Sequence, residues 1–142
     1  MLKIFVKKLI IFLLTLEARL VLLRYRPKII AVTGSVGKTA TKDAIFVVLE
    51  KKFAVGKSPK SFNSDIGVPL AILRIEKSAW GSVSGWSRIL LRGFFAILFL
   101  PRYPEWLVLE TGVDRPGDMA RLTRYIKPDC VVITRFGDTP VH

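Results

Sequence analysis

Hydrophobic residues recur at helical spacing in the first 27 residues, and the pattern changes after them. On a helical wheel this segment has one wide apolar face, formed by Leu2, Phe5, Val6, Leu9, Leu13, Leu16, Leu20 and Leu23. The other side carries Lys7, Lys8, Thr15 and Arg19, together with Ile11 and Leu22. This pattern predicts an amphipathic, basic helix over residues 1–27 whose polar face is imperfect.

From residue 28 onward, short β-rich runs alternate with helix-like stretches. Strands are expected at 28–33, 53–55, 105–110 and 130–134, and helices at 39–52, 65–73 and 117–126. A second apolar and basic helix is expected within 85–104, weakened at Gly93 and stopped by Pro101. Alternating strands and helices predict an α/β fold in which helices flank a parallel sheet. Ligands of such sheets bind beyond the carboxyl ends of the strands.

The charge of the chain is strongly positive and unevenly distributed. The formal net charge is +12, and residues 1–28 hold seven cations and one acid, so they supply six of these charges. Such a balance attracts polyanions, whether nucleic acid, anionic lipid or phosphorylated substrates. No recognised nucleic-acid motif accompanies the basic residues, so a nucleic-acid partner is not expected.

The N-terminal helix has two possible roles. Its longest uncharged run, Leu9 to Leu16, is shorter than the roughly 20 residues of a spanning helix. No small-residue cleavage site of a signal peptide follows it. The helix either lies on an anionic membrane surface or packs on the rest of the protein. The second apolar-basic segment strengthens the membrane hypothesis, although the two helices could instead pack on each other.

Cys130 is the single cysteine of the chain, which excludes a framework of disulfides within it. A protein without such disulfides is compatible with a reducing compartment. Because Val131, Val132 and Ile133 follow it, we expect Cys130 to be a buried strand residue.

The stretch "AVTGSVGKTATKDAI", from Ala31 to Ile45, predicts a phosphate-binding loop between a strand and a helix. Gly34 and Gly37 would let the backbone approach an anion closely, and the helix that follows would present its positive end. Lys38 would reach the terminal phosphates of a nucleotide, and Thr39 would offer its hydroxyl to Mg²⁺. The strict loop pattern requires a further glycine where Val32 stands, so the motif is a variant. The alternative is an ordinary glycine turn with a solvated lysine.

The form T-G-S-x-G-K-T resembles the phosphate loop of the Mur ligase family. Three further segments resemble that family in the right order: "SFNSDIGVPLAIL", "LVLETGVDRPGDMARL" and "IKPDCVVIT". The resemblance implies a P-loop NTPase-like central domain over residues 28–142, incomplete at its C-terminus and preceded by the helix of residues 1–27. Related enzymes continue past this point with a carbamylated lysine and a C-terminal domain. The chain is therefore interpreted as the front part of a longer Mur-ligase-like protein, inactive in isolation.

The resemblance also assigns roles to individual residues. It implies that ATP is bound by Gly34, Ser35, Val36, Gly37, Lys38, Thr39 and Ala40. Lys38 and Asn63 match catalytic positions, although the family asparagine that precedes Asn63 is Ser61 here. Thr39, Glu110 and His142 match magnesium ligands, although "RFGDTPVH" is longer than the common spacing before that histidine. From the residues alone, Glu110 could also be a solvated acid at the end of a strand.

The implied activity is ATP-dependent amide-bond formation in peptidoglycan precursor synthesis, through an acyl-phosphate. Among family members, these motifs are most similar to the ligase that adds D-alanyl-D-alanine to a UDP-muramoyl peptide. The implied partners are ATP, Mg²⁺, the UDP-muramoyl peptide and an amino acid or dipeptide, at a cytoplasmic location with peripheral attachment to the inner face of the membrane. Two other functions stay open, namely a nucleotide-binding module without ligase activity and a membrane-surface protein with a vestigial loop.

Overall fold

The computed structural model describes residues 2–59, 64–76, 83–100, 102–112 and 117–135. Its centre is a sheet of four parallel strands in the order β2-β3-β1-β4. The strands are β1 (Lys28–Thr33), β2 (Val55–Lys57), β3 (Trp106–Glu110) and β4 (Cys130–Ile133). The predicted α/β class with a parallel sheet is confirmed.

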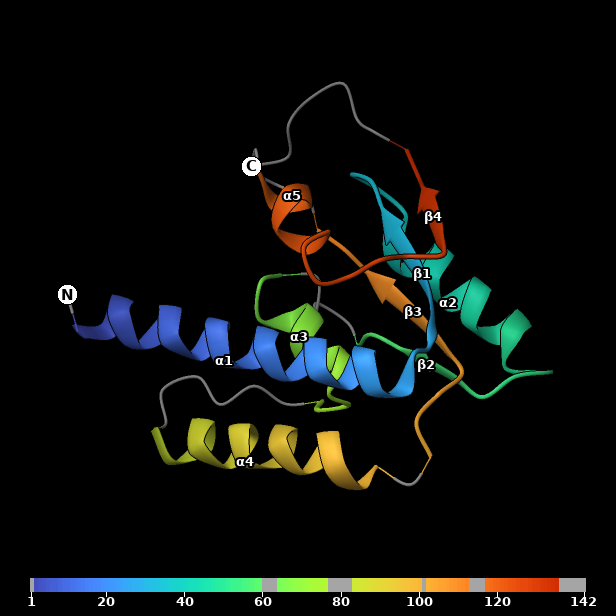
Figure 1. The fold of residues 1–142 in the computed structure, drawn as a ribbon. Helices are drawn as coiled ribbons and strands as arrows, with labels where there is room; N and C mark the ends of the chain where they lie inside the picture. Colours follow the sequence, from blue (N-terminus) through green and yellow to red (C-terminus); the bar gives the residue numbers. More distant parts are fainter. Residues whose placement is uncertain (1, 60–63, 77–82, 101, 113–116, 136–142) are drawn as a thin grey trace.

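Five helices are described around this sheet: α1 (Leu2–Tyr25), α2 (Lys38–Leu49), α3 (Gly67–Ile72), α4 (Val83–Phe99) and α5 (Asp118–Leu122). Helix α2 covers one face of the sheet, where Ile45 and Leu49 pack against Val32 and Val108. The larger core lies on the other face and joins α1, α3, α4 and α5 to the sheet. Figure 1 shows α4 beyond α1, on the side away from the strands. The fold is therefore a sheet with one helix on one face and a thicker helical layer on the other.

The strand register brings the carboxyl ends of β1, β3 and β4 together. Val32, near the end of β1, pairs with Glu110 on one side and with Val132 on the other. The loop after β1 therefore lies between the ends of β3 and β4, as expected for a ligand site in this fold.

The observed element bounds differ from the predicted ones mainly at α2, β2 and α5. Helix α2 ends at Leu49 rather than at 52. Strand β2 begins at Val55, two residues later than predicted, because the ring of Phe53 packs on Trp106 and Val55 is the first residue to pair with β3. Helix α5 ends at Leu122 rather than at 126, and an irregular turn follows in which the Ile126 amide still bonds to the Leu122 carbonyl.

Helix α1 is part of the core, although the face that it buries is not the predicted one. Leu14, Ala18 and Val21 are fully buried against the rest of the protein. The ring of Tyr25 stacks on Tyr103 at 4.8 Å. Most of the apolar face predicted from the helical wheel points to solvent instead. The helix is thus apolar on two opposite sides, and its packing on the protein, one of the two alternatives, is observed.

Cys130 is exposed, so the prediction of a buried strand residue is wrong. The physical reason is its position on β4, which lies at the edge of the sheet and pairs only with β1 among the described strands. Val131 and Ile133 are also largely exposed, and no described helix packs closely on this strand. A run of apolar residues predicts a strand, but it does not show which side of the sheet is covered.

The contact between α1 and α4 encloses a carboxylate. Glu17 faces Gly93, where any side chain would collide with the Glu17 carboxyl group. The Glu17 Oε2 atom is buried and has no hydrogen-bond partner among the described residues. Burial raises the pKa of Glu17 from 4.5 to about 7. The sequence predicted that Gly93 weakens this helix. In the structure α4 continues through Gly93, which permits the close contact with Glu17.

We predict that Glu17→Gln makes the protein more stable above neutral pH, where the buried Glu17 carboxylate destabilises the parent. A carboxyl group whose pKa is raised in the folded state binds more protons there than in the unfolded chain, so stability falls as the pH rises from about 4.5 to about 7. The variant should gain about 1 kcal/mol over the parent near pH 8 and little near pH 4, because solvent screens part of the effect. Urea unfolding across this pH range measures the difference, and a gain that is the same at every pH would contradict the prediction.

Candidate functional site

The loop after β1 requires glycine at two positions, for different reasons. Gly34 has a φ of 135°, and a side chain there would collide with the hydroxyl of Thr134. Gly37 has a φ of 83° and is the N-cap of α2, with open space where a side chain would lie. Gly34 is thus needed for close packing and for its backbone conformation, and Gly37 for its conformation alone.

The first half of the loop is fixed by the chain after β4. The amide groups of Ser35 and Val36 donate to the Arg135 carbonyl, at 2.9 and 3.4 Å. The Thr134 amide donates to the Thr33 carbonyl at 2.8 Å. Two of the predicted phosphate-binding residues, Ser35 and Val36, therefore direct their amides toward Arg135. The role of the loop in binding ATP stays a prediction.

The second half of the loop is the amino end of α2. The first amide groups of a helix have no carbonyl partner within it, and the helix dipole makes this end positive. Here these are the amides of Lys38, Thr39 and Ala40, which follow Gly37 directly. This end of α2 is the part of the loop best suited to an anion.

The Lys38 side chain lies across the loop. Its ammonium group donates to the Gly34 carbonyl at 2.7 Å and to the Ser35 carbonyl at 3.4 Å. The ammonium group is therefore held by the carbonyls of the loop, and its predicted contact with the terminal phosphates stays a prediction.

A buried carboxylate joins the loop to β3. Glu110 is 4% exposed, and its Oε2 atom accepts a hydrogen bond from the Thr39 hydroxyl at 2.9 Å. The Lys42 ammonium group is 3.4 Å from the same oxygen and is itself buried. Glu110 therefore lies beside the loop and is not a solvated acid. Its predicted role as a magnesium ligand stays a prediction.

The backbone around Glu110 is also fixed. The Glu110 amide donates to the hydroxyl of the buried Ser58 at 2.9 Å, and the Thr111 amide donates to the Val32 carbonyl at 2.9 Å. These bonds tie the end of β3 to both neighbouring strands. The carboxylate is thus held in one place by the sheet rather than by a mobile loop.

Lys42 was not predicted from the sequence as part of this site. It lies one helical turn after Lys38 and three residues after Thr39, so a helix from Lys38 places it on the same side as these residues. A buried acid at the end of β3 also needs a cation, since an unpaired charge in the interior is costly. These two signals together could have identified Lys42.

The donor atoms fit magnesium only in part. Magnesium prefers oxygen ligands and usually binds through one or two carboxylates, waters and substrate phosphates. The Thr39 hydroxyl and the Glu110 carboxylate are two such oxygens beside the loop. Among the described residues no group of three or more His, Cys, Asp or Glu could hold a metal ion. The two oxygens could therefore hold the ion only together with phosphate oxygens and water.

Two predicted site residues lie outside the described part of the chain. These are Asn63, expected near the phosphates and substrate, and His142, expected at a second magnesium. Ser61 also lies there. Their roles stay predictions.

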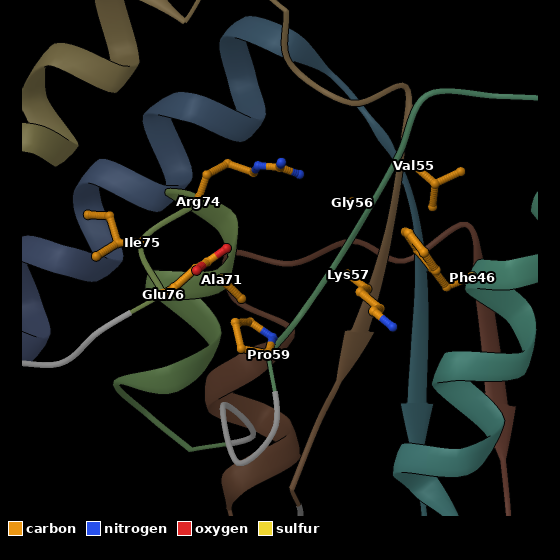
Figure 2. Close-up of a pocket in the computed structure, with 9 residues that line it drawn as sticks. All are labelled: Phe46, Val55, Gly56, Lys57, Pro59, Ala71, Arg74, Ile75 and Glu76. Carbon is orange, nitrogen blue, oxygen red and sulfur yellow. The ribbon is translucent and has the colours of Figure 1, made fainter. Parts of the chain in front are cut away.

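A hollow separate from the loop lies at the opposite edge of the sheet from β4, between β2 and α3 (Figure 2). Its volume is about 220 Å³, and Arg74 extends across it toward Gly56. Lys57 also lines it and forms an ion pair of 2.8 Å with Asp43. None of the residues predicted to bind ATP or magnesium lines this hollow, so the loop remains the candidate site.

The fold and the loop together define a class of protein, an α/β domain with a glycine-containing loop between β1 and α2. Comparison with known proteins shows what the chain is similar to. The Mur ligase middle domain matches residues 32–83. This segment of the chain is therefore similar to the Mur ligase middle domain.

The relatives found in this family share one name, UDP-N-acetylmuramoyl-tripeptide–D-alanyl-D-alanine ligase. The protein of Borreliella burgdorferi is 36% identical over 109 residues, which are 77% of this chain and 18% of the relative. The protein of Synechocystis is 46% identical over 114 residues, which are 80% of this chain and 20% of the relative. The chain thus spans about a fifth of the length of these relatives.

Solved structures agree with the sequence comparison. MurF ligase from Thermotoga maritima, solved in complex with ADP, matches 91% of this chain and 24% of its own, with a TM-score of 0.65 and 30% identity. MurF from Acinetobacter baumannii matches 85% of this chain and 21% of its own, with a TM-score of 0.59 and 22% identity, which supports the fold alone. The predicted resemblance to the Mur ligase family, and within it to the D-alanyl-D-alanine-adding ligases, is confirmed.

We predict that Lys42→Met destabilises the protein by about 3 kcal/mol, because it leaves the buried Glu110 carboxylate without its cation. In the double variant Lys42→Met with Glu110→Gln the loss should be smaller than the sum of the single losses, since the two side chains interact directly. Urea unfolding of the three variants measures this coupling. The exposed pair of Lys57 and Asp43 gives the control, because Lys57→Met should cost less than about 1 kcal/mol. Equal effects at the two pairs would contradict the structural role of the buried pair.

Proposed function

We propose that the chain binds ATP with magnesium at the loop of residues 34–40 and supplies the phosphate-activating part of an amide-forming ligase of peptidoglycan synthesis. The observation that carries the proposal is the hydrogen bond of 2.9 Å between the Thr39 hydroxyl and the buried Glu110 carboxylate, beside the amino end of α2. These groups are the oxygen ligands that a magnesium–nucleotide complex requires at such a loop.

The proposed reaction has two steps. A substrate carboxylate oxygen attacks the γ-phosphorus of ATP, the bond to the bridging oxygen breaks, and ADP leaves. The amine of the second substrate then attacks the acyl carbon, loses a proton and displaces inorganic phosphate. The names of the relatives support a UDP-muramoyl-tripeptide as the acyl substrate and D-alanyl-D-alanine as the amine. A cytoplasmic location is part of this proposal.

The residues of this chain would act mainly by positioning and by charge stabilisation. Lys38 would leave the loop carbonyls and place its ammonium group against the transferring phosphate, where negative charge spreads. Thr39 and Glu110 would hold magnesium, which supplies positive charge between the phosphate oxygens when it is bound. Lys42 would keep the Glu110 carboxylate in place. Asn63 and His142 are proposed to contact the phosphates and a second magnesium.

We predict that Lys38→Ala weakens ATP binding by about tenfold to a hundredfold, because a charge-assisted hydrogen bond to phosphate is lost. Calorimetric titration of ATP in the presence of Mg²⁺ measures the affinity without requiring the ligase reaction. Lys51→Ala is the matched control, since this exposed lysine follows the far end of α2 and should leave the affinity unchanged. An unchanged affinity in Lys38→Ala would exclude the loop as the nucleotide site.

We predict that Glu110→Gln lowers the affinity for ATP when Mg²⁺ is present and leaves it nearly unchanged when the metal is removed with a chelator. The amide keeps the shape of the carboxylate but is a much weaker magnesium ligand. Titration with and without metal measures the two affinities, and Glu50→Gln, at an exposed acid, is the control. An equal loss under both conditions would show a structural role of Glu110 instead of metal binding.

A further inference from the structure

Helices α1 and α4 lie side by side and run in the same direction (Figure 1). Both helices also carry exposed apolar side chains that are not part of the core. We call this surface the outer face. On α1 it comprises Phe5, Leu9, Phe12, Leu16, Leu20 and Leu23, and on α4 it comprises Leu91, Phe94, Phe95, Leu98 and Phe99. Phe12 is 62% exposed, Phe95 56% and Phe99 69%. Exposed apolar residues in such number on neighbouring helices are typical of interaction sites.

The outer face is not needed for the fold. The core contacts of α1 come from Leu14, Ala18 and Val21, which lie on the opposite side of that helix. Those of α4 come from Trp86 and Ile89. A surface helix normally carries polar residues opposite its buried side, and these two helices carry leucine and phenylalanine there.

Cations border this apolar surface. Lys8 and Arg19 are exposed along one side of the outer face of α1, and Arg88 and Arg92 are exposed along that of α4. The two described helices contain one acid, Glu17, which is turned toward α4 and half-buried. The charge of the surface is therefore of one sign, and it complements an anionic partner.

A hollow of about 270 Å³ beside α4 combines the same two chemistries. Arg74 and Arg92 line it together with Phe95 and Phe99. A hollow lined by both basic and aromatic residues suits a molecule with an anionic head and an apolar tail.

We propose that the outer face of α1 and α4 binds the surface of an anionic phospholipid membrane. The leucine and phenylalanine side chains enter the boundary between head groups and acyl chains, and the bordering cations contact lipid phosphates. The two helices lie in the plane of the membrane. None of the described helices is long and apolar enough to cross a bilayer.

This orientation leaves the candidate nucleotide site accessible. The carboxyl ends of β1, which the loop follows, and of β4 point away from α1 and α4 (Figure 1). A membrane that contacts the outer face would therefore not cover the loop. The proposal goes beyond nucleotide binding and does not depend on it.

A second copy of the chain fits the outer face less well than a membrane does. Two outer faces in contact would bring their cationic borders together, and like charges at an interface are unfavourable. A bilayer supplies phosphate groups around an apolar interior, which matches the arrangement of this surface.

The test uses the full chain with substitutions on its surface, because deletion of α1 would expose the core that Leu14, Ala18 and Val21 fill. The probes are vesicles of phosphatidylcholine alone and of phosphatidylcholine mixed with phosphatidylglycerol. The parent should sediment with the mixed vesicles, less so as salt rises, and only weakly with phosphatidylcholine.

The apolar part of the surface is tested by Phe12→Ser combined with Phe95→Ser. This variant should bind the mixed vesicles at least about tenfold more weakly, since two aromatic side chains no longer enter the lipid. The matched control is Val47→Ser combined with Val48→Ser on α2, where both valines are exposed on the other side of the sheet. The control should bind as the parent does, and circular dichroism should show that both variants are folded.

The charged part is tested by Arg88→Gln combined with Arg92→Gln, with Lys51→Gln combined with Lys52→Gln as the control. Both double variants lose two positive charges, so an effect of net charge alone would be the same in each. Loss of binding on the order of tenfold in the arginine variant, with a smaller loss in the lysine variant, supports the proposal.

Three results would overturn the proposal. The first is that the parent does not sediment with the mixed vesicles. The second is that the outer-face variants bind as well as their controls. The third is that the parent forms dimers in sedimentation velocity that Phe12→Ser with Phe95→Ser dissociates, while vesicles are not bound. This last result would assign the outer face to a second copy of the chain.

Discussion

The buried carboxylate of Glu110 is the constraint on which the arrangement of the candidate site depends. It ends the strand next to β1 and accepts a hydrogen bond from Thr39, on the first turn of α2. A charge in the interior is costly unless it is paired, and Lys42 provides the pair. The position of α2 over the sheet, and with it the position of the phosphate loop, is therefore coupled to a single acidic side chain. The same side chain is the proposed metal ligand.

The sheet holds this arrangement from both sides. Ser58, after β2, binds the Glu110 amide, and the carbonyl of Arg135, after β4, binds the amides of the loop. Residues that are far apart in the sequence thus fix one short segment from two directions. The backbone of the loop and the Glu110 carboxylate are thus held in place by the sheet itself.

The helical layer serves a different purpose from the site. Its inner side completes the core, with Tyr25 and Tyr103 stacked between α1 and the chain before β3. Its outer side adds nothing to folding and is apolar with a basic border. One helix thus combines two apolar sides, and this is why its sequence shows a broad hydrophobic pattern with an imperfect polar face.

The sequence by itself determined the α/β class, most element positions and the similarity to the Mur ligases, because periodicity, glycine spacing and motif order are local properties of the chain. It also indicated Glu110, since an acid at the end of an apolar strand can be recognised from the sequence alone. Only the tertiary structure decided which side of α1 is buried, that Cys130 is exposed on an edge strand, and that Lys42 pairs with Glu110. These facts depend on which elements become neighbours, and a helical wheel or a strand pattern holds no information about the partner that will cover it.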